Sequence, residues 1–139
     1  KAMYEGEELD KQAEKVLIGA MRVRDALQYI QNNSLMIIPG DRDDMIQATC
    51  EVHSGKLKKG CAISGVILSG GILPRIKTLA LLKTTNIPVL VTDEETYAIA
   101  SRVHSLIVKL KPQDSHKIKI IVDMVEKYVD IDNILKHLK

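Results

Sequence analysis

Short aliphatic runs alternate with polar breaks and helix-period segments along most of this chain. The three clearest runs are residues 35–38, 65–68 and 88–91. Each run is short, rich in Ile, Val and Leu, and bounded by turn residues, which is typical of a buried strand. The helix-period segments that follow these runs are residues 43–53, 74–85 and 96–108. Because strands that alternate with helices favour right-handed βαβ units, the pattern predicts a parallel sheet.

The two ends of the chain extend this pattern. Residues 15–18 predict a further strand, residues 23–30 a helix, and residues 2–4 a short edge strand. Toward the carboxyl end, one apolar stripe consists of Ile118, Ile121, Val122, Val125 and Val129, and a second of Ile131, Ile134, Leu135 and Leu138. We therefore expect an α/β fold: a three-layer α/β/α sandwich with a mostly parallel central sheet of about five strands and C-terminal helices, forming a single domain over residues 1–139.

Three local signals predict where the helices begin. Pro74 suits the first position of a helix, where its missing N–H is not needed. Thr92 and Glu95 have the Thr-x-x-Glu spacing of a capping box. Asp41 precedes its helix closely enough to cap it.

Composition narrows the class of protein. Hydrophobic residues make up 45% of the chain and charged residues 27%, which excludes a disordered tail. Aromatic residues are only 3%, so the core must be aliphatic. A net charge of +2 leaves no basic footprint for nucleic acid, and few aromatic side chains remain to stack bases.

Cysteine content and hydropathy predict a cytoplasmic protein. Cys50 and Cys61 are too few for a disulfide framework or a zinc site, which fits a reducing compartment. No run approaches the roughly 18 apolar residues of a membrane-spanning helix, and no signal-peptide pattern opens the chain. The first residue is Lys1 rather than Met, so we expect the chain to be part of a longer polypeptide.

Polar and glycine-rich residues follow each of the three main strands. In an open parallel sheet, ligands bind outside the carboxyl ends of the strands, where helix N-termini point their N–H groups outward. We therefore expect these residues to form one rim at that edge. They are Asp41, Arg42, Ser69, Gly70, Gly71, Asp93, Glu94, Thr96 and Tyr97.

Each candidate also has a structural interpretation. Arg42 opposes the helix dipole, so it either pairs with a neighbouring carboxylate or binds an anion. Gly70 and Gly71 either supply positive φ angles or, with Ser69, form an anion nest. Tyr97 either packs in the core or stacks on a base.

No catalytic motif accompanies the rim. The chain has no phosphate loop of the form G-x-x-x-x-G-K-[ST], no G-x-G-x-x-G, no G-x-S-x-G elbow and no H-E-x-x-H. The four histidines share no ligand spacing, and Cys50 is expected to be a small buried hydrophobe. We therefore predict no enzyme activity, no metal and no cofactor.

The order of these elements resembles the DRTGG domain, a family named for its Asp-Arg and Thr-Gly-Gly elements. Asp41-Arg42 matches the first element, and Ser69-Gly70-Gly71 matches the second with Ser in place of Thr, which keeps the hydroxyl and loses a methyl group. Residues 18–21 and 103–106 also look like the version found in long phosphate acetyltransferases. The resemblance covers about residues 16–135.

The resemblance implies an accessory module associated with regulation and subunit assembly, without established catalysis of its own. In the acetyltransferases the module lies between a P-loop-type domain and the acetyltransferase domain. The family also occurs beside CBS domains in some pyrophosphatases, and its fold is similar to the N-terminal domain of HPr kinase/phosphorylase. Because neither the P-loop domain nor the acetyltransferase domain is among these 139 residues, acetyl transfer is not carried over.

We expect a non-catalytic regulatory and oligomerisation module, with a homodimer favoured, that binds a small anionic ligand or nucleotide at the rim. In this hypothesis Arg42 and the amides of Gly70 and Gly71 hold the anion, while Ser69 and Thr96 donate hydroxyl hydrogen bonds. One alternative is a pure assembly domain in which Asp41 and Arg42 pair with each other or with backbone. Another is an accessory domain of a phosphate acetyltransferase-like or P-loop protein. A transferase or kinase would need a general base near Ser69, and the sequence supplies none.

Overall fold

The computed structural model describes residues 2–4, 13–105, 118–119 and 122–123. Contacts within the chain divide it into two units, residues 1–105 and residues 106–139. The fold below is that of the first unit. The expectation of one domain over residues 1–139 stays a prediction.

A five-stranded sheet forms the centre of this unit, in the order β1-β5-β4-β3-β2. The strands are β1 (Ala2–Tyr4), β2 (Lys15–Ile18), β3 (Ser34–Pro39), β4 (Ile63–Ser69) and β5 (Val89–Val91). Strands β2 to β5 are mutually parallel, and β1 pairs antiparallel with β5 at one edge. The predicted mostly parallel sheet of about five strands is therefore confirmed, with the short edge strand at the predicted residues.

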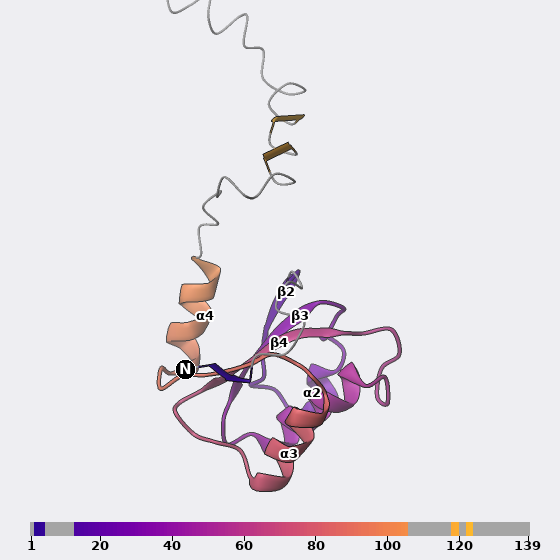
Figure 1. Cartoon of the computed structure of the whole chain (residues 1–139), viewed down its shortest axis with the longest axis vertical. Helices are drawn as coiled ribbons and strands as arrows, with labels where there is room; N and C mark the ends of the chain where they lie inside the picture. The colour runs from indigo at the N-terminus through magenta and orange to yellow at the C-terminus, as the bar shows by residue number, and fades with distance from the viewer. Residues whose placement is uncertain (1, 5–12, 106–117, 120–121, 124–139) are drawn as a thin grey trace, which may run out of the picture. The chain divides into compact units, whose positions relative to one another are not determined.

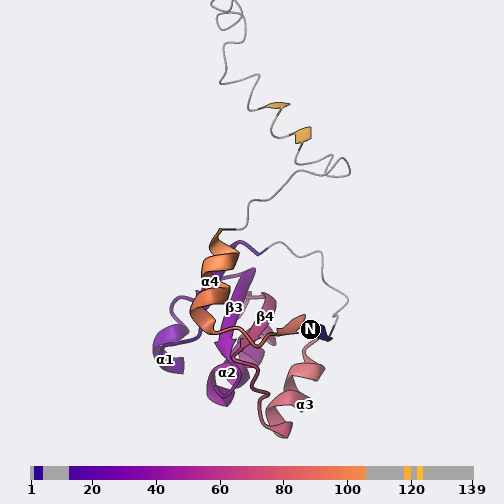
Figure 2. The ribbon, with the colours of Figure 1, turned by 90° about the vertical axis from the view of Figure 1, so that its left-hand side faces the viewer.

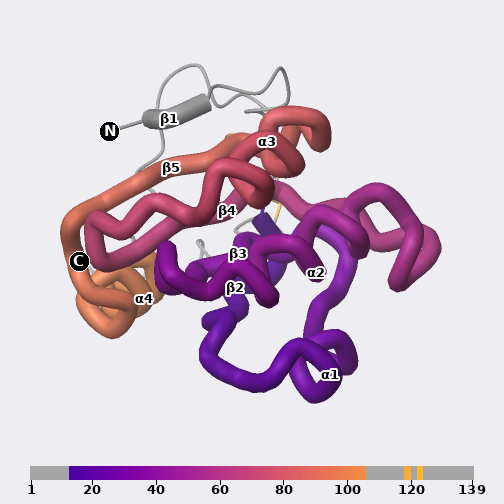
Figure 3. The backbone as a smooth tube through the Cα atoms, turned by 90° about the horizontal axis from the view of Figure 1, so that it is seen from below, coloured from indigo at the N-terminus to yellow at the C-terminus, as the bar shows by residue number. Residues whose placement is uncertain are grey.

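Helices cover both sides of the sheet, as a three-layer sandwich requires. They are α1 (Val23–Ala26), α2 (Asp43–His53), α3 (Ile76–Thr84) and α4 (Thr96–His104). Figures 1 and 2 show α2 beside α3, and α4 apart from both. Viewed from below, α1, α2 and α3 lie on one side of β2 to β5 and α4 on the other (Figure 3).

Alternating side chains of the strands form two cores of different size. On the side of α1 to α3, the larger core includes Met36 and Ile38 of β3 and Val66 and Leu68 of β4, packed against α2. On the other side, a small core joins residues 37 and 67 to Ile99 of α4. Successive side chains of β3 and β4 point to opposite faces of the sheet. Because both faces are buried, the sequences of these strands are continuous aliphatic runs.

Several helix ends differ from the sequence prediction. Helix α3 begins at Ile76, two residues after Pro74, and α4 begins at Thr96, after Glu95. The predicted capping box is wrong, because the Thr92 hydroxyl accepts a hydrogen bond from the Glu94 N–H, at 3.2 Å, in a tight turn before the helix. Asp41 does not cap α2 either, since Arg42 occupies the N-cap position without a side-chain cap bond.

Helix α1 is shorter than the predicted 23–30, because the chain tightens after Ala26: the Tyr29 N–H donates to the Ala26 carbonyl, three residues back. The Lys58 ammonium, 2.5 Å from the Ile30 carbonyl oxygen, holds the end of this turn. Of the predicted C-terminal stripes, Ile118 and Val122 are helical, and the other members lie outside the described residues. Within the described part of the chain, none of the helices has the length and apolar character needed to span a membrane.

Candidate functional site at the carboxyl edge of the sheet

Four loops meet where the parallel strands end. They are residues 19–22 after β2, 40–42 after β3, 70–75 after β4 and 92–95 after β5. Backbone hydrogen bonds link neighbouring loops: the Gly40 N–H donates to the Ser69 carbonyl at 3.1 Å, and the Gly70 N–H donates to the Glu94 carbonyl at 2.8 Å. The structure thus brings the Asp-Arg and Gly-Gly elements together on one rim, as the parallel topology requires.

Arg42 ties two of these loops together. Its guanidinium makes a two-pronged pair with the Asp44 carboxylate, with Nε–Oδ1 at 2.8 Å and Nη2–Oδ2 at 3.0 Å. The same group donates to three backbone carbonyls of the β2–α1 loop, at 3.0–3.4 Å; these belong to Gly19, Ala20 and Met21. Arg42 therefore makes the structural pairing, one of its two interpretations. Its planar group already matches a carboxylate and a row of carbonyls.

Electrostatics at this pair are mutually reinforcing. The hydrogen bond from Arg42 holds the pKa of the Asp44 carboxyl below its usual range, and the same bond raises the pKa of Arg42. Asp41, by contrast, is exposed. Arg42 therefore pairs with Asp44, two residues after it, rather than with Asp41, which precedes it.

Asp43 joins the starts of two helices. It is the first residue of α2, yet its Oδ1 accepts a hydrogen bond from the Arg75 N–H, at 3.0 Å, where α3 begins. A hydrogen bond from the Thr78 side chain and the one from Arg75 lower the pKa of Asp43. Sequence analysis missed this role, because a cap supplied from another helix leaves no local spacing to recognise.

Gly70 and Gly71 form a turn in which both residues have positive φ, +81° and +66°. Their amides are already used: Gly70 donates to the Glu94 carbonyl, and Gly71 donates to the Thr92 carbonyl at 2.9 Å. The twin glycines therefore supply positive φ angles in a turn, and the anion nest stays a prediction. An anion could use these amides only by displacing the β5–α4 loop.

Gly40 is a second position where the backbone comes close, and no local pattern indicates it. A Cβ at Gly40 would lie 1.8 Å from the carbonyl oxygen of Ile72, in a different loop. No side chain fits at that distance. Gly40 thus fixes how closely the β3–α2 and β4–α3 loops approach.

Ser69 and Thr96 bridge β4 and α4 through their hydroxyl groups. The two oxygens are 2.7 Å apart, and Ser69 is 2% exposed. Tyr97, one residue further, is 76% exposed, so it lies outside the core. The hydroxyl of Ser69 is therefore engaged within the fold, whereas the ring of Tyr97 faces solvent.

The rim carries more acidic than basic side chains. Its loops and the first turns of the adjoining helices bear seven carboxylates, at positions 25, 41, 43, 44, 93, 94 and 95, and five basic groups, at positions 22, 24, 42, 75 and 77. Such an edge repels a free phosphate more than it attracts one. Among the described residues no group of His, Cys, Asp or Glu is arranged to hold a metal ion.

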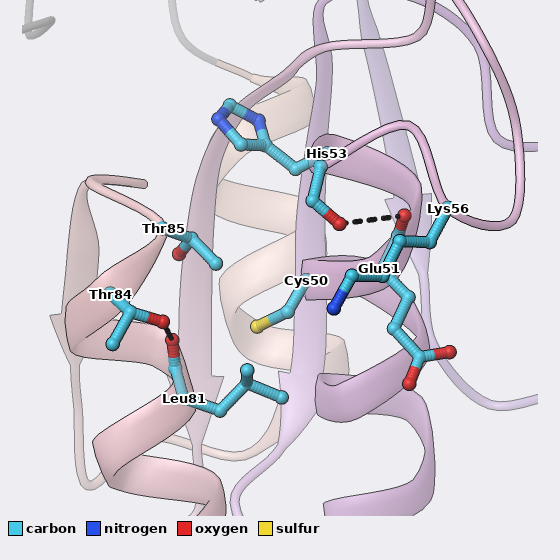
Figure 4. A pocket seen from close by; sticks show the side chains of 8 residues that line it. Cys50, Glu51, His53, Lys56, Leu81, Thr84 and Thr85 are labelled. Carbon is cyan, nitrogen blue, oxygen red and sulfur yellow. Dashed lines mark hydrogen bonds between the residues drawn. The ribbon is translucent and has the colours of Figure 1, made fainter.

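A pocket of about 270 Å³ lies away from this rim, where α2 and α3 end (Figure 4). Cys50 is 1% exposed at its base, and burial raises the pKa of this thiol to about 11. The Thr84 hydroxyl donates to the Leu81 carbonyl of its own helix, at 2.7 Å. The pocket is also lined by the side chains of Glu51, His53 and Lys56.

Comparison with known proteins agrees with the motif. The family described as the DRTGG domain matches residues 1–106. Phosphate acetyltransferases of Nitratidesulfovibrio vulgaris and Synechocystis sp. are each 28% identical to this chain, over 92% and 88% of its length. That of Pseudomonas putida is 25% identical over 90% of it. The chain spans only 18% of the length of each of these enzymes.

Among solved structures, the chain is similar to the regulatory region of Clostridium perfringens pyrophosphatase, which consists of CBS and DRTGG domains in complex with the activator diadenosine tetraphosphate. The TM-score is 0.50 at 26% identity, covering 63% of this chain and 33% of that one. The family match, over residues 1–106, spans the sheet and the rim described above. The chain belongs to the DRTGG domain family.

Proposed function

We propose that this chain is a regulatory module that self-associates and carries out no chemistry of its own. Its rim is a surface for contact with other protein, and the Asp-Arg and Gly-Gly elements give that surface a fixed shape. Of the hypotheses drawn from the sequence, this one combines regulation with the assembly alternative.

One observation carries the proposal: the donors of both elements, on Arg42, Gly70 and Gly71, are paired inside the fold. Arg42 is bonded to Asp44 and to three carbonyls, and the amides of Gly70 and Gly71 are bonded to the next loop. Catalytic and anion-binding sites keep such donors open toward the substrate. Donors that are already paired favour a structural task.

The relatives support a regulatory task. The chain corresponds to a small part of each matching acetyltransferase, and its structural relative is a regulatory region. A module of this kind acts by biasing how neighbouring protein is arranged, with coupling free energies of typically about 1–3 kcal/mol.

Sedimentation velocity of the purified chain over two decades of concentration tests the proposal. We expect a concentration-dependent shift from monomer to a discrete oligomer. A chain that stays monomeric throughout contradicts self-association, and turnover of acetyl phosphate or a nucleoside triphosphate contradicts the absence of chemistry.

Nucleotide binding at the rim is the second candidate. The structural relative is complexed with diadenosine tetraphosphate, and the exposed ring of Tyr97 beside Ser69 and Thr96 offers a surface on which a base could stack. Because the rim is acidic, phosphate groups would bind there with a divalent cation. Titration calorimetry with diadenosine tetraphosphate, with and without Mg²⁺, tests this: binding that is lost in Tyr97→Ala supports it, and binding that is absent or unchanged in the variant contradicts it.

A further inference from the structure

Three large aliphatic side chains lie exposed within five residues of the rim. Ile72 is 47% exposed, Leu73 57% and Ile76 89%. They follow directly on β4, in which all seven residues are buried. We call these three residues the 72–76 patch. Adjacent exposed aliphatic side chains on an otherwise well-buried fold mark a contact surface.

The backbone beneath the patch is held firmly. The Ile72 carbonyl rests against Gly40, and the Arg75 N–H is bonded to Asp43. Pro74, between them, is buried. The exposed side chains therefore project from a fixed platform, so little conformational freedom is lost when they are covered.

Charges of opposite sign lie at the two ends of the patch. At the Ile72 end are two exposed carboxylates: Asp41, next to Gly40, and Asp93, whose Oδ1 lies 2.8 Å from the place of a Cβ on Gly71. At the Ile76 end are the exposed basic residues Arg75 and Lys77. Arg75 is already paired with Asp43, with Nε–Oδ2 at 3.5 Å, so the charge that this end offers to a partner is that of Lys77. The sequence of features along the surface is thus acidic, aliphatic, basic.

A surface with this order is complementary to itself. Rotation by 180° places the acidic end of one copy against the basic end of the other and the aliphatic centres against each other. We propose that the 72–76 patch is the surface through which two copies of this chain associate, with Asp41 of each copy facing Lys77 of the other. This inference rests on the proposed self-association and assigns its surface.

Sedimentation equilibrium of the full chain tests the patch. Ile76→Asp is the first variant, because a side chain that is 89% exposed can change without loss of folding. We expect it to raise the dimer dissociation constant about tenfold or more. Leu57→Asp, at an exposed leucine far along the chain from the patch, is the matched control and should leave the constant unchanged.

Charge reversal sharpens the test. Asp41→Lys and Lys77→Glu should each weaken association by about threefold to tenfold, and the double variant should restore it, because both ends are then exchanged together. Circular dichroism spectra equal to that of the wild type verify folding.

The outcomes separate this inference from the one on which it rests. A wild-type chain that is monomeric at every concentration overturns both, and assigns the patch to a different protein. A wild-type dimer that Ile76→Asp leaves intact, or a double charge reversal that fails to restore association, overturns the assigned surface and leaves self-association standing.

Discussion

The loops at the carboxyl edge of the sheet and the hydroxyl groups at the far ends of α2 and α3 form their hydrogen bonds in different ways. At the carboxyl edge, the loops bond to one another across long stretches of sequence, as when Arg42 holds the carbonyls of residues 19–21. At the far ends of α2 and α3, hydroxyl groups bond to carbonyls of their own helix, three residues away. The loops at the carboxyl edge therefore depend on tertiary contacts, whereas the hydroxyl groups at these helix ends bond locally.

The family's sequence motif and the pocket lie in different places. The recognisable residues of the family lie at the carboxyl edge, where they cross-link loops beneath an exposed aliphatic surface. The pocket lies where the helices end and has no motif. The recognisable sequence elements thus lie where loops are joined to one another. The hydrogen-bond donors of these elements are already paired.

Gly40→Ala should have the largest effect on stability. The added methyl group would lie 1.8 Å from the Ile72 carbonyl oxygen, and both partners are backbone, so neither can rotate away. We expect a loss of about 3 kcal/mol or more in the free energy of unfolding, measured by urea denaturation.

Gly60→Ala is the matched control for this variant. Gly60 has φ +67° and open space around its Cβ position, so only the backbone strain of about 1–2 kcal/mol applies. Equal losses for the two variants would mean that the loops at the carboxyl edge separate easily, against the view that close approach holds them.

Cys50 tests the opposite edge. Because burial raises its pKa from 9.0 to about 11, the thiolate fraction at pH 8 falls about a hundredfold. In a Cys61→Ala background, we expect iodoacetamide to modify the folded chain at least that much more slowly than the urea-unfolded chain. Rapid modification of the folded chain would identify this pocket as a reactive site and reverse the contrast between the edges.

Arg42→Ala measures the contribution of the loop clamp, by which we mean the bonds from Arg42 to Asp44 and to the carbonyls of the β2–α1 loop. The variant loses the two-pronged pair with Asp44 and the bonds to three carbonyls, and we expect urea denaturation to show a loss of about 1–2 kcal/mol in the free energy of unfolding.

Arg102→Ala is the comparison for the clamp, since Arg102 makes an exposed ion pair with Glu94 at 2.9 Å. An exposed pair is worth about 1 kcal/mol or less. If Arg42→Ala costs no more than Arg102→Ala, the carbonyl bonds contribute nothing, and Arg42 is left available for a ligand.

The sequence predicted those parts of the fold that depend on nearby residues. Strands β3, β4 and β5 were recognisable because each is a short aliphatic run between turn residues, and the meeting of their loops follows from parallel pairing. The bounds of α2, Asp43–His53, were predicted to the residue.

Features that depend on distant partners could not be predicted. The start of α3 is set by Asp43, 32 residues before Arg75. The helix start predicted at Pro74 was therefore wrong. The requirement for glycine at position 40 depends on the Ile72 carbonyl. The choice between an anion and Asp44 for Arg42 depended on whether the β2–α1 loop would offer its carbonyls, which no local pattern encodes.

The smallest expected effect is the loss of free energy of unfolding as the solution becomes acidic. Asp43 and Asp44 have pKa values below the 3.8 of an unfolded chain, because each carboxylate accepts hydrogen bonds in the folded state. The folded chain therefore binds fewer protons than the unfolded chain near that pH. The stabilisation is complete well above pH 4 and is lost as the pH falls through the lowered pKa values.

Urea denaturation of Asp44→Asn between about pH 3 and pH 6 measures this contribution, over the window in which carboxylates titrate. We expect the variant to be less stable than the wild type at pH 6 and the difference to shrink toward pH 3. At a protein concentration where the chain is monomeric, Asp41→Asn, which lies outside these hydrogen bonds, should follow the wild-type curve. A constant difference between Asp44→Asn and wild type across the range would mean that the Arg42–Asp44 pair acts through shape alone, and the carboxyl edge would then be held by the carbonyl bonds of Arg42 rather than by its charge.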